Sequence, residues 1–273
     1  MDRVSTMGYG LGYIGGSTIP LLIFLVMNAV GVDMLYCLSF IFGFTAVWWA
    51  AFSWPLLKNV EQKSYQPHEK GAIRKTLRGL WATLKDIFGH KSIFVFMLAY
   101  FFYIDGVGTI IDNAINIGTD LNLNTVGQVV FLLATQVVAF GGSLVFAKLS
   151  KKYNTVTLIL VCIAGYFGIA LYALMLSSLL HFAILAFFIG CFQGSIQSLS
   201  RSYYSKIIPA ENSGEYFGIY DIFSKGASFL GSAVIAAVKL AGGTINVAVA
   251  CLAVFFALGF LFLRIADKQK AIR

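Results

Sequence analysis

Charge is scarce in this chain: Asp, Glu, Lys and Arg make up only 12% of its 273 residues, against about a quarter of an average soluble domain. Hydrophobic residues make up 59%. A soluble fold of this length could not bury so much apolar surface, so the surrounding medium must be lipid. The sequence therefore predicts an integral membrane protein whose main partner is the lipid bilayer.

Histidine is rarer still, with three residues, and the four cysteines lie singly inside apolar runs. No Ser-His-Asp or Cys-His set can be assembled, and the sequence contains no phosphate loop, nucleotide fingerprint or HExxH motif. We therefore expect no enzyme activity, no metal and no cofactor. A net charge of +8 would suggest nucleic acid in a soluble protein. Here the basic residues lie in loops between apolar runs, so no nucleic-acid partner is expected.

Eight apolar runs are long enough to cross a bilayer, which takes about 20 residues in a helix. We therefore predict an all-α, polytopic membrane protein with eight transmembrane helices. The runs are Met7–Asn28, Asp33–Leu57, Ile93–Ile117, Leu123–Phe146, Thr155–Leu176, Leu180–Leu199, Glu215–Leu240 and Thr244–Ile265.

The distribution of basic residues predicts the orientation. With the N-terminus in the cytoplasm, every Lys and Arg except Lys239 falls on the cytoplasmic side, in agreement with the positive-inside rule. The opposite orientation would reverse this distribution. Both termini are therefore predicted to be cytoplasmic.

One long loop, residues 58–92, separates the second run from the third. Its apolar residues recur at helical spacing, and a basic face lies opposite them, which predicts an amphipathic helix on the inner membrane surface. We interpret it as a linker resting on the lipid headgroups; the alternative is a regulatory or lipid-sensing element. The apolar residues are Ile73, Leu77, Leu80, Trp81, Leu84 and Phe88, and the basic residues are Arg74, Lys75, Arg78 and Lys85.

The third run contains most of the ionisable and amide side chains that would lie inside the membrane. Such groups are functional candidates, because burying an acid in a bilayer costs about 3 kcal/mol even on the mildest scale. Steps of seven and four place Asp105, Asp112 and Asn116 on one helical face, with Asn113 beside them. We favour substrate or proton binding at these residues over a purely structural role.

Other runs supply weaker candidates. Gly106 and Gly108 follow Asp105 closely, so an interruption of the third helix is expected there. In the seventh run Asp221 and Lys225 are four residues apart and can pair, either as a gate or as a plain stabilising contact. Glu215 has the spacing of a capping-box residue. The second-choice cavity ligands are the glutamines of the fourth and sixth runs: Gln128, Gln136, Gln193 and Gln197.

Three stretches of the sequence resemble one family. They are DRVSTMGYGLGYIGG at residues 2–16, AYFFYIDGVGTI at residues 99–110 and GSIQSLSRSYYSKIIPAENSGEYFGIYDIFSKGASFLG at residues 194–231. They resemble the vacuole effluxer-like branch of the major facilitator superfamily, which includes autophagy-related vacuolar amino-acid effluxers and bacterial relatives. The loop at residues 141–154 resembles the superfamily's cytoplasmic motif only in its small residues and basic cluster, because the usual acidic residue is missing.

The resemblance implies a partial major facilitator fold. Transporters of this superfamily have twelve helices in two halves, and the eight runs align with the fifth through twelfth. Residues 1–57 would supply two helices of the N-terminal half, residues 58–92 the cytoplasmic linker, and residues 93–273 the six-helix C-terminal half. The first four helices would be missing, so we expect self-association or completion by N-terminal helices. The membrane would be the inner membrane in a bacterium and the vacuolar membrane in a fungus.

These observations predict a secondary active transporter that moves a small-molecule solute by alternating access. Asp105 and Asp112 are expected to bind a proton or a cationic group, so proton coupling is part of the prediction. Amino-acid efflux is what the family resemblance implies. A non-transporting membrane scaffold or degenerate transporter is the main alternative, and a passive channel is the weaker one. We also expect that the 273-residue chain does not transport alone.

Overall fold

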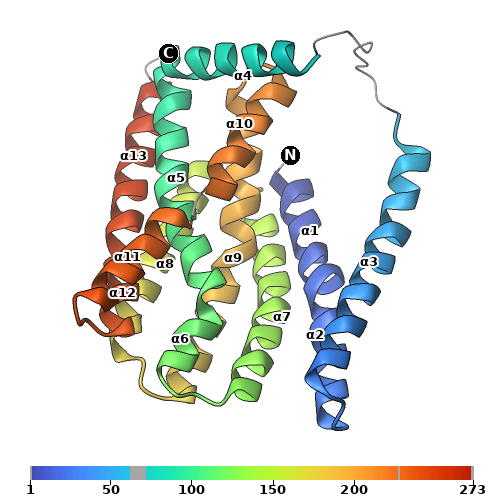
Figure 1. Cartoon of the computed structure of the whole chain (residues 1–273). Coiled ribbons are helices and arrows are strands. Elements are labelled where there is room, and N and C mark those ends of the chain that lie inside the picture. The colour runs from blue at the N-terminus through green and yellow to red at the C-terminus, as the bar shows by residue number, and fades with distance from the viewer. Residues whose placement is uncertain (1, 62–71, 227, 272–273) are drawn as a thin grey trace.

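The structure, a computed structural model, describes residues 2–61, 72–226 and 228–271. Over these ranges the chain folds into helices joined by short loops, and no strand occurs in them (Figure 1). Each of the eight predicted runs overlaps one membrane-length apolar helix, so the prediction of an all-α polytopic membrane protein is confirmed. Within the described residues these eight spans are Asp2–Ala29, Met34–Asn59, Lys91–Asp112, Val126–Leu149, Thr155–Met175, Leu179–Ile207, Ser213–Leu240 and Ile245–Lys268.

The first two spans stand at one side of the molecule (Figure 1). The first consists of α1 (Asp2–Gly12), a π-helical turn (Tyr13–Thr18) and α2 (Ile19–Ala29), and the second is α3 (Met34–Asn59). The Asp33 side chain caps α3 by accepting a hydrogen bond from a backbone amide at 2.9 Å. α1 packs on the rest of the protein, whereas α3 packs on α2 and is exposed over most of its length.

The other six spans form the bundle that holds the candidate site. Four of its helices are capped at their N-termini by side chains that accept a hydrogen bond from a backbone amide of the first turn: Asn124, Asn154, Ser178 and Thr244. In the bundle interior α5 (Lys91–Asp112) packs along α13 (Ala253–Ala271), and buried apolar and aromatic side chains fill the space between them. The helices are α5 (Lys91–Asp112), α6 (Ala114–Asp120), α7 (Thr125–Leu149), α8 (Thr155–Tyr172), α9 (Leu179–Ile207), α10 (Ser213–Gly226), α11 (Phe229–Leu240), α12 (Ile245–Cys251) and α13 (Ala253–Ala271).

The amphipathic helix predicted in the long loop is present as α4 (Ala72–Gly89), which lies across one end of the bundle in Figure 1. Its inner side chains Thr83 and Ile87 are buried where α4 packs on α5 and α10. Hydrophobic residues on its outer side stay exposed. Three side chains named in the prediction lie outside the described part: Ile73, Arg74 and Lys75.

Positive charge is concentrated at one end of the molecule, here called the basic end. The start of α1, the whole of α4 and the end of α13 lie there (Figure 1), as do Lys148 and Lys206 in the last turns of α7 and α9. Lys239 lies at the opposite end, 2.5 Å from the carboxylate of Asp120. Cytoplasmic placement of the basic end stays a prediction, and so do the domain boundaries at residues 57 and 92.

We expect reporter fusions to agree with this charge distribution. A tag in the loop at residues 62–67 and a tag after Arg273 should both report cytoplasm, because basic loops are retained on that side. A tag at Asn122, between α6 and α7, should report the opposite side. Finding the two basic-end tags on different sides of the membrane would contradict the eight-span topology.

Candidate substrate and coupling site

Among the described residues the seventh span is interrupted, as is the eighth between α12 and α13, whereas the third is not interrupted at its glycines. α10 ends at Gly226 and α11 begins at Phe229, and Ser228 between them has a left-handed backbone with φ +77°. The expectation of an interruption at Gly106 and Gly108 was wrong, because α5 runs unbroken through both. Glycine weakens a helix by only about 1 kcal/mol, and here the two glycines permit close packing instead.

Those close approaches are specific. A Cβ at Gly106 would lie 2.7 Å from the ring of Phe256 on α13, and a Cβ at Gly108 would lie 2.2 Å from the hydroxyl of Ser228. The second approach brings α5 directly against the joint between α10 and α11. The polar face of the third span and the break in the seventh therefore meet at one place.

Asp105 is the residue at that meeting point. Its side chain is fully buried, and its Oδ1 accepts hydrogen bonds from the backbone amides of Ser228 and Gly231, both at 2.9 Å. The Thr109 hydroxyl donates a third bond at 3.2 Å. Ser228, the N-cap residue of α11, makes no side-chain cap of its own. Asp105 therefore supplies the cap from another helix, at a terminus where negative charge is stabilised.

The second oxygen of this carboxylate is spare. Among the described residues Asp105 Oδ2 is buried and has no hydrogen-bond partner. Buried polar atoms are nearly always satisfied, so this oxygen is able to take a further partner. A proton, a water molecule or a donor group of a solute would fit this oxygen.

Further polar side chains extend the site along α5 and α6. Asn113 donates through Nδ2 to the Thr109 carbonyl at 3.0 Å and to Ser232 Oγ of α11 at 3.5 Å. Asn116 donates to Asn113 Oδ1 at 3.4 Å. Two of the predicted residues thus join Asp105 in one chain of contacts, which faces α11.

Asp112 shares the helical face of Asp105 but not its environment. It is the last residue of α5 and is exposed, and it makes no ion pair among the residues that the structure describes. The start of α11 packs over Asp105 and buries it, whereas the Asp112 side chain is exposed. The two acids therefore offer different chemistry: one is a buried cap with a spare oxygen, and the other is an open carboxylate.

The four predicted glutamines lie in different parts of the bundle. Gln136 and Gln193 line a hollow of about 40 Å³ between α5, α7 and α9, which has room for a few water molecules at about 10–15 Å³ each. Gln128 lies away from this hollow, fully buried against Gly118, and donates to the Leu123 carbonyl at 2.9 Å. Gln197 is half-buried on α9. Of the four, only the first two are brought together.

The predicted pairing of Asp221 with Lys225 was wrong. The Asp221 carboxylate lies 3.5 Å from Nη1 of Arg201 on α9, and Lys225 makes no ion pair within the described ranges. Arg201 is held in place by the ring of Phe217, whose centroid is 4.8 Å from the guanidinium carbon. Both charged side chains are about half exposed. The sequence analysis did not identify Arg201 as a partner of Asp221. The available signal was its position as a basic residue directly after the sixth apolar run.

A second missed cluster joins α1 to the bundle at the basic end. We call Asp2, Thr155, Ser202 and Lys206 the Asp2 cluster. Asp2 Oδ1 accepts from Ser202 Oγ at 2.5 Å and from Lys206 Nζ at 2.6 Å, and Asp2 Oδ2 accepts from Thr155 Oγ1 at 2.8 Å. One turn further, the Ser5 hydroxyl donates to a backbone carbonyl of α9 at 2.9 Å. These contacts fasten the first span to α8 and α9.

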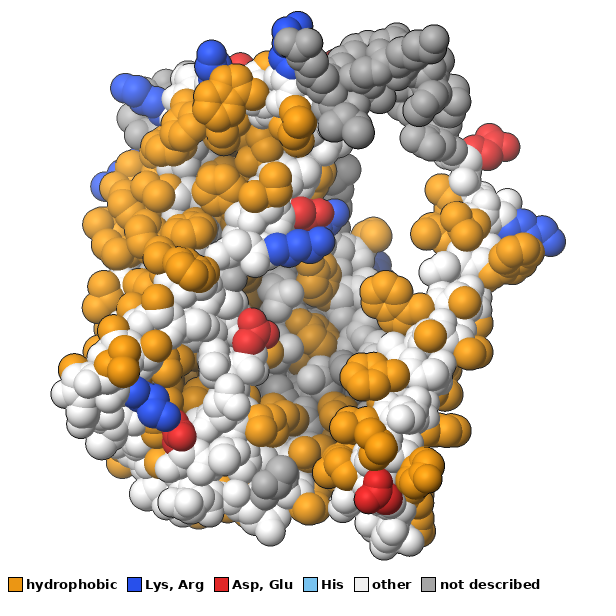
Figure 2. All heavy atoms as spheres, viewed as in Figure 1, with side chains coloured by type: hydrophobic (Ala, Val, Ile, Leu, Met, Phe, Trp, Pro, Cys, Tyr) orange, Lys and Arg blue, Asp and Glu red, His pale blue; other side chains and the backbone are white. Residues whose placement is uncertain are grey.

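A hollow separates α3 from the bundle in the space-filling view, and acidic and basic side chains lie on its bundle wall (Figure 2). Tyr9 of α1 lies within electrostatic range of Arg201 and Asp221. The charged pair on α9 and α10 therefore lies near α1, which packs on α9.

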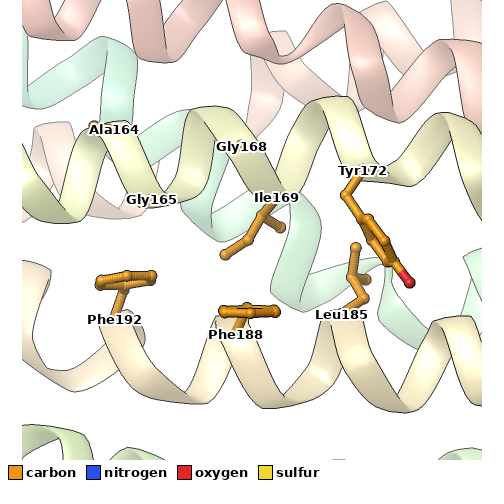
Figure 3. A pocket seen from close by; sticks show the side chains of 8 residues that line it. All are labelled: Ala164, Gly165, Gly168, Ile169, Tyr172, Leu185, Phe188 and Phe192. Carbon is orange, nitrogen blue, oxygen red and sulfur yellow. The ribbon is translucent and has the colours of Figure 1, made fainter.

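A larger groove elsewhere has no such chemistry. It measures about 340 Å³, lies between α8 and α9, and presents aromatic rings and glycines, with the Tyr172 hydroxyl at one end (Figure 3). Several of its lining residues are exposed on the outer face of the bundle. A groove of this kind suits a lipid chain and lies apart from the polar site.

Comparisons with known proteins identify the family. Residues 1–273 match the family model described as "Vacuole effluxer Atg22 like". The chain is 37% identical over 275 residues to "Uncharacterized MFS-type transporter YxiO" of Bacillus subtilis (strain 168), covering 98% of this chain and 64% of that protein. It is 25% identical over 300 residues to "Autophagy-related protein 22" of Botryotinia fuckeliana (strain B05.10), covering 98% of this chain and 50% of that protein.

The chain thus spans about half to two-thirds of the length of the curated relatives it matches. No solved structure matches it. Because the family model covers the whole chain, the resemblance found in its motifs is confirmed, and the chain belongs to the family of vacuole effluxer Atg22-like proteins.

Proposed function

We propose that the chain forms the larger part of a secondary transporter that moves a small solute by alternating access and is driven by protons. The observation that carries this proposal is the buried Asp105 carboxylate, which caps an interrupted span with one oxygen and keeps the other unpaired. Coupling-ion and substrate sites of secondary transporters lie beside such interrupted helices. A matched relative is named an MFS-type transporter, which agrees with this proposal.

The cap suggests how a proton is coupled to movement. While Asp105 is ionised, its negative charge holds the start of α11 through the amides of Ser228 and Gly231. A proton added at Oδ2 removes that charge and weakens both bonds. α11 is then free to shift relative to α10 about the joint at Ser228, and release of the proton restores the cap.

Arg201 and Asp221 are the proposed contacts for the solute. Their side chains are 3.5 Å apart and about half exposed, so their mutual attraction is weak. An amino acid carries a carboxylate and an ammonium group, and each would replace one partner of this pair. Asp112 offers a second open carboxylate for an ammonium group. Amino-acid efflux, with Asp221 as a gate that closes on Arg201, is therefore the version of the function that we propose.

Further helices are part of the proposal. α3 packs on α2 and is exposed over most of its length. In the first span, a Cβ at Gly8 or Gly12 of α1, or at Gly16 of the π-helical turn, would meet no described atom within 4 Å. Small residues along one side of a membrane helix permit close contact with another helix. N-terminal helices or a second copy of the chain would cover this side.

The test is reconstitution with and without the missing partner. The chain is placed in liposomes alone and together with the part of the Bacillus subtilis relative that lies outside the matched region, and uptake of labelled amino acids is measured under an imposed pH gradient. We expect saturable, gradient-driven transport from the combination only. Transport by the chain alone would contradict the need for further helices unless it assembles with a second copy.

A non-transporting scaffold is the second candidate, favoured by the same exposed side of α1 and α3. It predicts stable association with the added helices and no transport of any amino acid in either preparation. That result, with both polypeptides inserted and folded, would overturn the transporter proposal.

A further inference from the structure

The outer side of α4 is divided into two strips. A helix advances about 100° per residue, so Leu77, Trp81 and Phe88 fall within about 40° of one another. These three side chains are 62%, 60% and 57% exposed, although they are large and hydrophobic. They form an apolar strip beside the buried edge at Thr83 and Ile87, which packs on the bundle.

The second strip is basic. Arg78 and Lys85 lie seven residues apart and fall within about 20° of each other, about 40–60° beyond Trp81. Both are exposed, and Lys85 Nζ lies 5.9 Å from the centre of the Trp81 ring. The order around the helix is therefore protein contact, apolar strip, basic strip. A bilayer edge presents the same order of environments, from hydrocarbon to charged headgroups.

Two side-chain hydrogen bonds also join α4 to α10. The Thr83 hydroxyl donates to Glu215 Oε2 at 2.5 Å, and the Tyr216 hydroxyl donates to the carboxylate of Asp86. A Cβ at Gly79 would lie 2.8 Å from Glu215 Oε1, so the two helices touch closely. Glu215 thus bonds a neighbouring helix, which corrects its expected role in a capping box. Both acids at this contact are occupied by α4 or α10 partners, and among the described residues no acid forms an ion pair with Arg78 or Lys85.

We propose that α4 binds anionic phospholipid headgroups through Arg78 and Lys85, with Leu77, Trp81 and Phe88 inserted among the acyl chains, and that this contact holds α10 in place. Charge complementarity and the adjoining aromatic strip favour lipid over an acidic protein, because Trp and Lys together suit the interface between hydrocarbon and headgroups. The site does not depend on the transport proposal. α4 contacts α10, the part of the seventh span that precedes the joint at Ser228, so lipid bound to α4 would act on the joint from the basic end.

The binding test uses the purified 273-residue chain and counts bound phosphatidylglycerol and phosphatidylcholine by native mass spectrometry. Each basic residue near an anionic surface contributes about a fivefold factor in binding. Replacing both Arg78 and Lys85 with Gln should therefore weaken phosphatidylglycerol binding by at least tenfold and leave phosphatidylcholine unchanged. The matched control replaces Lys148 and Lys151 with Gln, which removes the same charge at the basic end but not from α4, and should keep clearly more phosphatidylglycerol binding than the α4 variant.

The coupling test measures thermal unfolding in nanodiscs with and without phosphatidylglycerol. We expect the lipid to raise the Tm of the wild-type chain. Thr83→Val should bind the lipid as wild type but show a smaller rise, because the bond to Glu215 is gone while the bond from Tyr216 to Asp86 remains. Thr83→Ser should keep the full rise, and an undiminished rise in Thr83→Val would contradict the coupling to α10. Equal binding of both lipids, or equal losses in the Lys148 and Lys151 control, would overturn the proposal.

Discussion

Replacing Asp105 with Asn is expected to abolish proton-driven transport by the complete assembly while leaving the chain folded. The Asn oxygen can still accept the amides of Ser228 and Gly231 and the hydroxyl of Thr109, so α11 keeps its cap. The amide nitrogen takes the place of the spare Oδ2 and cannot bind a proton. We expect uphill transport to fall to background while solute exchange continues, with a loss of about 1 kcal/mol in stability from weaker, uncharged bonds.

The matched variant is Asp105→Ala, which removes the cap as well as the charge. Two buried amide donors then lack their acceptor, at about 1–3 kcal/mol each, so thermal unfolding should occur at a clearly lower temperature than for the Asn variant. Wild-type uphill transport by Asp105→Asn would show that the carboxylate is only a helix cap. Equal loss of stability in the two variants would show that the cap contributes little.

The second large effect is expected at Gly231, which approaches α5 more closely than any side chain would allow. In Gly231→Ala the new Cβ would lie 2.1 Å from Thr109 Oγ1, 2.8 Å from Thr109 Cβ and 3.0 Å from Asp105 Oδ1. The hydroxyl can rotate away, but a Cβ attached to the backbone of α5 cannot. α11 must therefore shift, which breaks the bond from the Gly231 amide. Overpacking of this kind costs about 1–3 kcal/mol, and transport should be lost with it.

Thermal unfolding and transport of three variants separate this effect from a general effect of alanine. Gly214→Ala lies in α10, where a Cβ would meet no described atom within 4 Å, and it should be neutral or slightly stabilising. Thr109→Ala in the Gly231→Ala background should restore part of the lost stability, because the nearest clashing atom is removed. If Gly231→Ala behaves like Gly214→Ala, the close contact between α5 and α11 is not needed.

The spans and the amphipathic helix could be predicted because each depends on local composition. A run of apolar residues long enough to cross a bilayer is visible without any knowledge of its neighbours, and α4 shows its apolar face at helical spacing. Asp105 could be singled out for the same reason, since an acid in such a run is costly wherever it packs; its role in transport stays a prediction.

The partners of these residues could not be predicted, because they come from distant parts of the chain. The amides that bond Asp105 belong to residues 123 and 126 positions away. Glycine content placed the interruption in the wrong helix, since Gly106 and Gly108 serve close packing and the break falls at a serine with positive φ. Asp221 had an acceptable partner one turn away at Lys225, yet the fold brings Arg201 to it from α9.

The Asp2 cluster has a mechanical consequence. It anchors the first span at the basic end, and the span then runs 28 residues to Ala29, or about 42 Å at 1.5 Å per residue. Contacts between this span and the bundle become fewer from α1 to α2, so the span can pivot at Asp2: a tilt of about 10° there would carry the far end about 7 Å sideways. A movement of that size matches the width of a small solute. The four side chains of the Asp2 cluster would then be the pivot of this movement. The strength of their hydrogen bonds to Asp2 would determine whether the span moves at Ala29 or detaches at Asp2.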